Sequence, residues 1–143
     1  MNKIFIFICL FVGISFANDI IIKDAFVKQN TPNSKNTAIF LKIINNTKND
    51  ISLIEAKSDF AKVVELHDHI KDKNKITMIK VDEFVIKAQN NFDLLPGGAH
   101  IMLFDIKENI NKNTKINLKL IFSDGNIINI KNIPSKQIKH MKK

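Results

Sequence analysis

Cysteine is nearly absent from this chain of 143 residues, which contains one, Cys9. Cys9 lies in an apolar run near the N-terminus, with no small residue after it and no lipobox before it, so we expect no lipid attachment there. The remaining chain has no thiol, which excludes a disulfide framework, so the fold must be stabilised by its core. A blue-copper electron-transfer centre is also excluded, because it requires a cysteine thiolate.

The chain also lacks an apolar stretch long enough to span a membrane. Residues 4–14 are almost wholly apolar, but a transmembrane helix needs ~20 residues. The positively charged start at residues 1–3 precedes this run, and Ser15 and Ala17 offer small side chains at a cleavage site. This pattern predicts a cleaved signal peptide over residues 1–17, with a short membrane anchor as the alternative. We therefore expect a periplasmic protein that does not span the membrane after cleavage.

Arginine is absent, and the formal net charge is +8. All the basic side chains are therefore lysines, and the abundance of Asn and Ile beside them points to codon-composition bias as much as to function. We interpret the lysines as residues that solvate strand faces, with docking to acidic partners or anionic membranes as the alternative. An exported protein is not expected to bind nucleic acid.

Side-chain combinations typical of enzymes are missing too. The sequence offers no nucleophile beside a base, no carboxylate pair spaced for acid–base catalysis and no phosphate-cradling loop. We expect a binding protein rather than an enzyme.

Capped helical stripes are absent, whereas apolar and polar residues alternate in many short segments. Pro96, Gly97 and Gly98 predict a tight turn, and Asp124-Gly125 predicts a type I′ hairpin. The spacing predicts one all-β domain over residues 18–134, an antiparallel β-sandwich or Greek-key barrel, followed by a flexible basic tail over residues 135–143. The expected strands cover residues 20–28, 37–45, 51–57, 63–69, 75–81, 84–88, 100–105, 115–122 and 127–133.

Methionine and histidine are scarce, with four residues of each, yet four of them form the pattern His67-x10-Met78-x21-His100-x-Met102. Two imidazoles and two thioethers without a thiolate form a ligand set that suits Cu(I). His100 and Met102 share one face of a predicted strand. A hairpin after His67 would bring Met78 back near that histidine.

Each of these residues also has an ordinary interpretation. A histidine at a strand end is usually exposed or hydrogen-bonded, and a methionine such as Met78 usually fills a core. The joint spacing is what favours a metal site. His69 shares a strand face with His67 and is either an auxiliary ligand, a partner of His67 for Cu(II), or a solvated side chain. We interpret the tail pair His140-Met141 as unrelated to the site.

The four-residue pattern resembles the copper-binding signature of the PCu(A)C-type periplasmic copper chaperones. Residues 64–67, 95–103 and 122–125 are also similar to that family, and the resemblance extends from residue 20 to residue 134. It implies a cupredoxin-like β-sandwich that holds one Cu(I) ion and delivers it for the assembly of haem-copper (cytochrome c) oxidase. The implied partners are the oxidase copper-site subunit and a Sco-type or thioredoxin-like copper protein, and we expect a monomer.

Two positions depart from the family pattern. His69 stands where many relatives carry methionine, and Phe26 stands where relatives often carry tryptophan. Two other functions remain open from the sequence. Copper buffering or resistance would use the same site with different partners, and a structural or adhesive sandwich domain would bind no metal.

Overall fold

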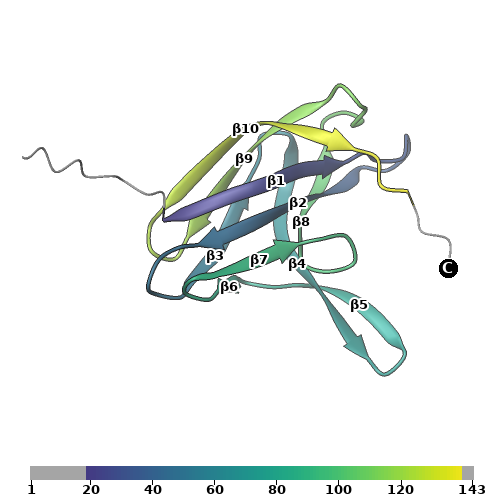
Figure 1. Ribbon diagram of the computed structural model, residues 1–143. Helices are drawn as coiled ribbons and strands as arrows, with labels where there is room; N and C mark the ends of the chain where they lie inside the picture. The colour runs from purple at the N-terminus through teal and green to yellow at the C-terminus, as the bar shows by residue number, and fades with distance from the viewer. Residues whose placement is uncertain (1–18, 140–143) are drawn as a thin grey trace, which may run out of the picture.

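The computed structural model describes residues 19–139, which form ten β-strands (Figure 1). They are β1 (Ile20–Lys28), β2 (Asn36–Asn45), β3 (Ile51–Lys57), β4 (Ala61–Asp72), β5 (Lys75–Lys80), β6 (Phe84–Ile86), β7 (Asn90–Leu94), β8 (His100–Ile106), β9 (Lys115–Phe122) and β10 (Ile127–Lys136). Among these residues, no helix has the length and apolar character of a membrane span. The predicted signal peptide and the pair His140-Met141 lie outside the described residues.

The strands form a two-layered β-sandwich, as the alternation of apolar and polar residues predicted. One layer has the order β5-β4-β8-β2-β1, with β7 also paired to β2, and the other has the order β10-β9-β3-β6. The pairing of β1 with β10 links the layers and is parallel, so the expectation of a purely antiparallel fold is wrong. The described strands also do not close into a barrel, because β5 and β6 end the series without pairing to each other.

Alternating side chains explain why these segments are strands that share one core. In β9 the buried residues Ile116, Leu118, Leu120 and Phe122 alternate with exposed or partly exposed ones. The facing layer contributes buried residues of β2, β4 and β8 to the same core. Burial of one face fixes the register, because a slip by one residue would turn the apolar set toward solvent.

Several expected boundaries differ from the structure. Strand β7 was not predicted, because its sequence Asn-Asn-Phe-Asp-Leu has few strand-forming residues. Strand β10 continues to Lys136, since Ser135 and Lys136 pair with the end of β1, so the first two residues of the expected tail belong to the sheet. Strand β4 extends to Asp72 and, with β5, forms a hairpin that reaches beyond the other strands (Figure 1).

The turn between β9 and β10 is not of type I′. That turn needs positive φ at both central residues, whereas Gly125 has φ 87° and Asp124 does not have a positive φ. Gly125 N donates to Phe122 O at 3.0 Å, and Phe122 N donates to Asn126 O at 2.9 Å. This pattern is a three-residue loop that ends in a bulge glycine.

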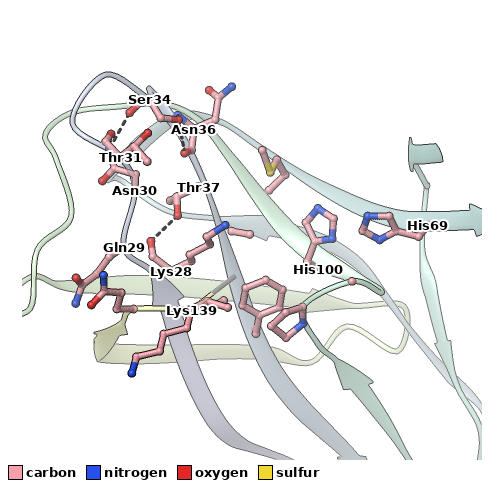
Figure 2. A pocket seen from close by; sticks show the side chains of 17 residues that line it. Lys28, Gln29, Asn30, Thr31, Ser34, Asn36, Thr37, His69, His100 and Lys139 are labelled. Atoms are coloured by element: carbon pink, nitrogen blue, oxygen red, sulfur yellow. Dashed lines mark hydrogen bonds between the residues drawn. The ribbon is translucent and has the colours of Figure 1, made fainter. Parts of the chain in front are cut away.

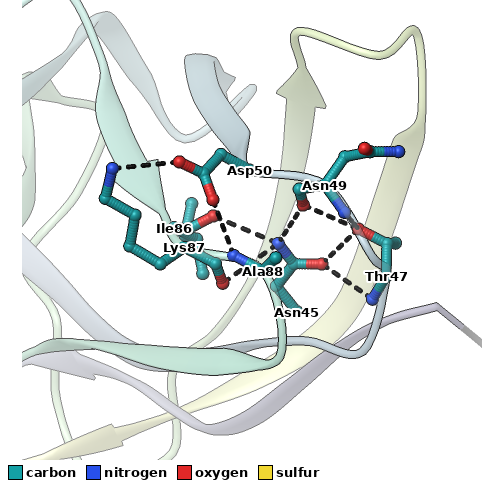
Figure 3. Close-up of polar contacts among 7 residues, drawn as sticks. All are labelled: Asn45, Thr47, Asn49, Asp50, Ile86, Lys87 and Ala88. Carbon is teal, nitrogen blue, oxygen red and sulfur yellow. Dashed lines mark hydrogen bonds and ion pairs between the residues drawn. The ribbon is translucent and has the colours of Figure 1, made fainter.

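A fully buried amide, that of Asn45, joins the end of β2 to the connection after β6 (Figure 3). Its Nδ2 donates to the carbonyls of Asn49, Ile86 and Lys87 at 2.9, 3.1 and 3.2 Å. Its Oδ1 accepts hydrogen bonds from the backbone N and the Oγ1 of Thr47 at 2.9 and 2.7 Å. One side chain thus satisfies backbone groups of two loops that would otherwise be buried without partners.

Substitution Asn45→Ala should lower the free energy of unfolding by about 2–4 kcal/mol, because each buried polar group left unpaired costs about 1–3 kcal/mol. Urea denaturation monitored by circular dichroism measures this change. Asn49→Ala is the matched control, since Asn49 joins this network through its backbone alone, and it should be nearly neutral. Equal stability of Asn45→Ala and the wild type would show that the network is not needed.

Candidate metal centre

The alternation of side chains along β8 places His100 and Met102 on the same face of the sheet. Ile101 and Leu103 are fully buried in the core, so His100 and Met102 lie on the opposite face of the sheet. The antiparallel pairing of β4 with β8 places His67 directly opposite His100 and Glu65 directly opposite Met102. Two residues that are 33 positions apart in sequence therefore become cross-strand neighbours.

Three imidazole rings gather at this place. The ring centroids of His67 and His100 lie 5.7 Å apart, and those of His69 and His100 lie 5.4 Å apart. The carbonyl oxygen of Gly98 accepts hydrogen bonds from Nδ1 of His69 at 2.9 Å and from Nδ1 of His100 at 2.8 Å. A carbonyl only accepts, so both rings carry a proton on Nδ1 and leave the Nε2 lone pair available. Figure 2 shows the rings of His69 and His100 side by side at the end of the groove.

His67 has a different environment. It is 7% exposed, and its ring packs between those of His100 and Phe104. Its Nε2 lies 2.8 Å from Oε2 of Glu65, whose other oxygen accepts a hydrogen bond from Lys80 Nζ at 3.0 Å. Nδ1 of His67 is the one buried side-chain nitrogen or oxygen without a hydrogen-bond partner in the described part of the chain.

The two thioethers lie at different depths. Met102 is partly buried and lines a groove of about 680 Å³ together with His69, His100 and Phe40. Met78 is 45% exposed on the projecting hairpin, where it pairs with His69, while Lys80 takes the position opposite His67. The hairpin predicted for Met78 is present, and it places Met78 opposite His69, two residues along β4 from His67.

The structure thus brings His67, His69, His100 and Met102 together and places Met78 at the rim. Between residues 19 and 139, no three His, Cys, Asp or Glu side chains converge closely enough to hold a metal ion by themselves. The sequence reasoning missed Glu65, although the spacing Glu-x-His on a predicted strand places both side chains on one face.

Burial is the main cause of a lowered pKa at His100. The hydrogen bond to Gly98 opposes this shift in part, and the neighbouring His69 and His67 rings add to it. At Glu65 the hydrogen bond from His67 is the main cause of a lowered pKa, and Lys80 contributes as well. His100 is therefore held neutral, the form that can bind a metal, and Glu65 is held as the carboxylate.

Sequence comparison gives the first external match. The family described as "Putative lipoprotein LpqE-like" matches residues 20–134. "Uncharacterized protein RP573" of Rickettsia prowazekii (strain Madrid E) is 33% identical over 99 residues, which cover 67% of this chain and 55% of the relative. "Putative lipoprotein Lxx21020" of Leifsonia xyli subsp. xyli (strain CTCB07) is 32% identical over 110 residues, covering 76% and 65%. The chain thus spans less than two thirds of the length of either relative.

Solved structures of PCuAC domains have the same fold. The copper-bound PCuAC domain from PmoF2 matches with a TM-score of 0.68 and 18% identity, covering 82% of this chain and 92% of that domain. The apo PCuAC domain from PmoF1 matches with a TM-score of 0.72 and 17% identity, covering 84% and 95%. CuI-DR1885 from Deinococcus radiodurans matches with a TM-score of 0.64 and 21% identity, covering 92% and 85%. The predicted cupredoxin-like sandwich is thereby confirmed.

The lowered pKa of His100 predicts that the metal-free protein loses stability on mild acidification. Below the ordinary histidine pKa of 6.5, the unfolded chain binds a proton at this position while the folded chain does not. The free energy of unfolding therefore decreases as the pH is lowered through that window. Urea denaturation between about pH 7 and 5.5, above the carboxylate range, measures the slope. His100→Phe keeps the size of the ring, removes the titrating group, and should reduce the slope of the free energy of unfolding against pH. An unchanged slope in that variant would show that His100 is not the cause of the pH dependence.

Proposed function

Because the chain belongs to the LpqE-like family and has the fold of the PCuAC domains, we propose that it is a copper-binding chaperone. The observation that supports the proposal most strongly is the cross-strand pair His67 and His100, with Met102 two residues further along β8 on the same face. The buried, unpartnered Nδ1 of His67 is a donor atom that a metal ion would satisfy. The copper-bound PmoF2 domain and CuI-DR1885 support the choice of metal.

The proposed cargo is one Cu(I) ion, held by His67, His100, Met102 and Met78. Thioethers and neutral imidazoles suit the monovalent ion, and none of them carries a negative charge that would favour Zn(II) or Mg(II). Met102 projects from a central strand, whereas Met78 is exposed on the projecting hairpin. We assign Met102 to the stable part of the site and Met78 to the part that closes over the ion.

This arrangement suits transfer by ligand exchange rather than catalysis. An acceptor thiolate approaches from the exposed side, replaces the weakly bound Met78 thioether, and then competes for the ion with the remaining ligands. No bond other than metal coordination is formed or broken, and the oxidation state stays the same. The proposed role is therefore that of a carrier, not of an enzyme.

The proposed place of action is the periplasm, and the proposed destination is the copper site of haem-copper (cytochrome c) oxidase. The lipoprotein description of the matching family supports an exported protein of the cell envelope. A Sco-type or thioredoxin-like copper protein is the proposed exchange partner. Deletion of the gene should then reduce oxidase activity in low copper, and restored activity on copper addition would support delivery. Copper sensitivity without an oxidase defect would instead indicate buffering.

Cu(I) titration against a competing chelator tests the ligand set. Met102→Leu and Met78→Leu conserve side-chain volume and remove sulfur, and we expect affinity losses of at least about tenfold for Met102→Leu and smaller losses for Met78→Leu. The difference arises because Met78 must be ordered on binding. X-ray absorption of the loaded wild type should show both sulfur and nitrogen scatterers. A spectrum with nitrogen and oxygen alone would rule out the thioethers.

His69 offers a separate test, because it shares the Gly98 carbonyl with His100. We expect His69→Ala to retain most Cu(I) affinity and to lose Cu(II) capture, since a third imidazole suits the divalent ion. His100→Ala is the matched comparison and should lose Cu(I). Equal loss of Cu(I) in both variants would place His69 among the Cu(I) ligands, in place of Met78.

A further inference from the structure

Among residues 19–139, Glu65 is the carboxylate that is hydrogen-bonded to a ring of the imidazole cluster, and both of its oxygens are engaged. Oε2 faces Nε2 of His67 at 2.8 Å, and Oε1 faces Nζ of Lys80 at 3.0 Å. The Glu65 side chain is 22% exposed, whereas that of Lys80 is 62% exposed. The chain of contacts therefore runs from the solvent-exposed ammonium through the carboxylate to the buried ring.

The Glu65 contact determines which nitrogen of His67 can bind a metal. A carboxylate is an acceptor, so the nitrogen facing it must carry the proton. The proton of the neutral ring is thus on Nε2, and the lone pair is on Nδ1, the buried atom without a partner. His100 has the opposite tautomer, because its Nδ1 donates to Gly98. The two facing histidines consequently offer different nitrogens.

We propose that Glu65 is a positioning residue that fixes the Nε2-protonated tautomer of His67, so that the site holds copper through Nδ1 of His67 and Nε2 of His100. This inference rests on the proposed function and deepens it. A carboxylate that holds the remote N–H of a ligating imidazole fixes the ring orientation and increases the basicity of the ligating nitrogen. Lys80 forms an exposed ion pair with the other carboxylate oxygen.

Direct coordination by Glu65 is the competing role for this side chain. It would require Oε2 to leave His67 or Oε1 to leave Lys80, and it would place a hard oxygen donor on a soft ion. It would also leave the buried His67 Nε2–H without its acceptor, which carries a desolvation cost. The geometry therefore favours Glu65 behind His67 rather than at the metal.

Nitrogen NMR of histidine-labelled protein tests the inference at about pH 8, where imidazoles are neutral. In the metal-free wild type, His67 should show a slowly exchanging Nε2–H, and His100 a protonated Nδ1. Addition of Cu(I) should shift the Nδ1 resonance of His67 while Nε2 keeps its proton. A proton on Nδ1 of His67, or loss of the Nε2 proton on loading, would overturn the proposal.

Substitutions separate positioning from folding. Glu65→Ala should lose the protected Nε2–H and weaken Cu(I) binding by about tenfold or more, the range seen when the partner of a ligating histidine is removed. Lys80→Ala should keep the proton and nearly all the affinity, because an exposed ion pair contributes little. Glu65→Gln in the Lys80→Ala background should retain both the protected Nε2–H and the Cu(I) affinity that Glu65→Ala loses, since no cation then competes for the amide oxygen.

The outcomes distinguish this inference from the proposed function. If Glu65→Ala bound Cu(I) as tightly as the wild type, the positioning role would be overturned and the proposed copper site would stand. Wild-type protein that fails to bind Cu(I) would overturn the proposed function itself. Circular dichroism melting of each variant shows whether a loss of affinity comes from unfolding.

Discussion

The register between β4 and β8 is the constraint on which the site depends. Leu66 pairs with Ile101 on the core side of the sheet, and both are buried, so the pairing cannot slip by one residue without exposing apolar area. That same register places His67 opposite His100 on the other face. The energy that holds the two imidazoles together is thus hydrophobic burial on the reverse side of the strands, and the histidines themselves need not stabilise the fold.

A second constraint comes from the turn before β8. Gly98 N donates to Leu95 O at 2.9 Å, and Gly97 has φ 87°, so the chain reverses tightly at Pro96-Gly97. This reversal leaves the Gly98 carbonyl beside the first residue of β8, where it accepts from His69 and His100 together. A single backbone group therefore orients two rings from different strands. Side-chain substitution at this position cannot remove the acceptor.

The sequence predicted most strands because short apolar and alternating segments are separated by turn residues, and the expected bounds of β1, β3 and β9 agree with the structure. Strict alternation holds in β9, whereas β1 and β3 each contain a shift in register. The sequence could not predict β7, whose place depends on pairing with the already formed β2, nor the parallel contact of β1 with β10, which is a long-range pairing. The same limit applies to the site. His100 and Met102 are neighbours by strand periodicity alone, whereas the location of Met78 depends on a hairpin register. Lys80, not Met78, faces His67 because the loop between β4 and β5 is short.

Under the proposed carrier function, the different depths of the proposed ligands affect how the ion is retained and released. Ligands on central strands are ordered before the ion arrives, so their binding involves little loss of conformational entropy and gives retention. A ligand on a projecting, exposed hairpin must be ordered on binding and is released first. His67 and His100 are 7% and 4% exposed, whereas Met78 is 45% exposed, so the proposed ligands include both buried and exposed side chains. Under the proposed function, retention and release thus depend on different strands of one sheet. A change in the hairpin can alter the rate of transfer without altering the register that forms the inner pair.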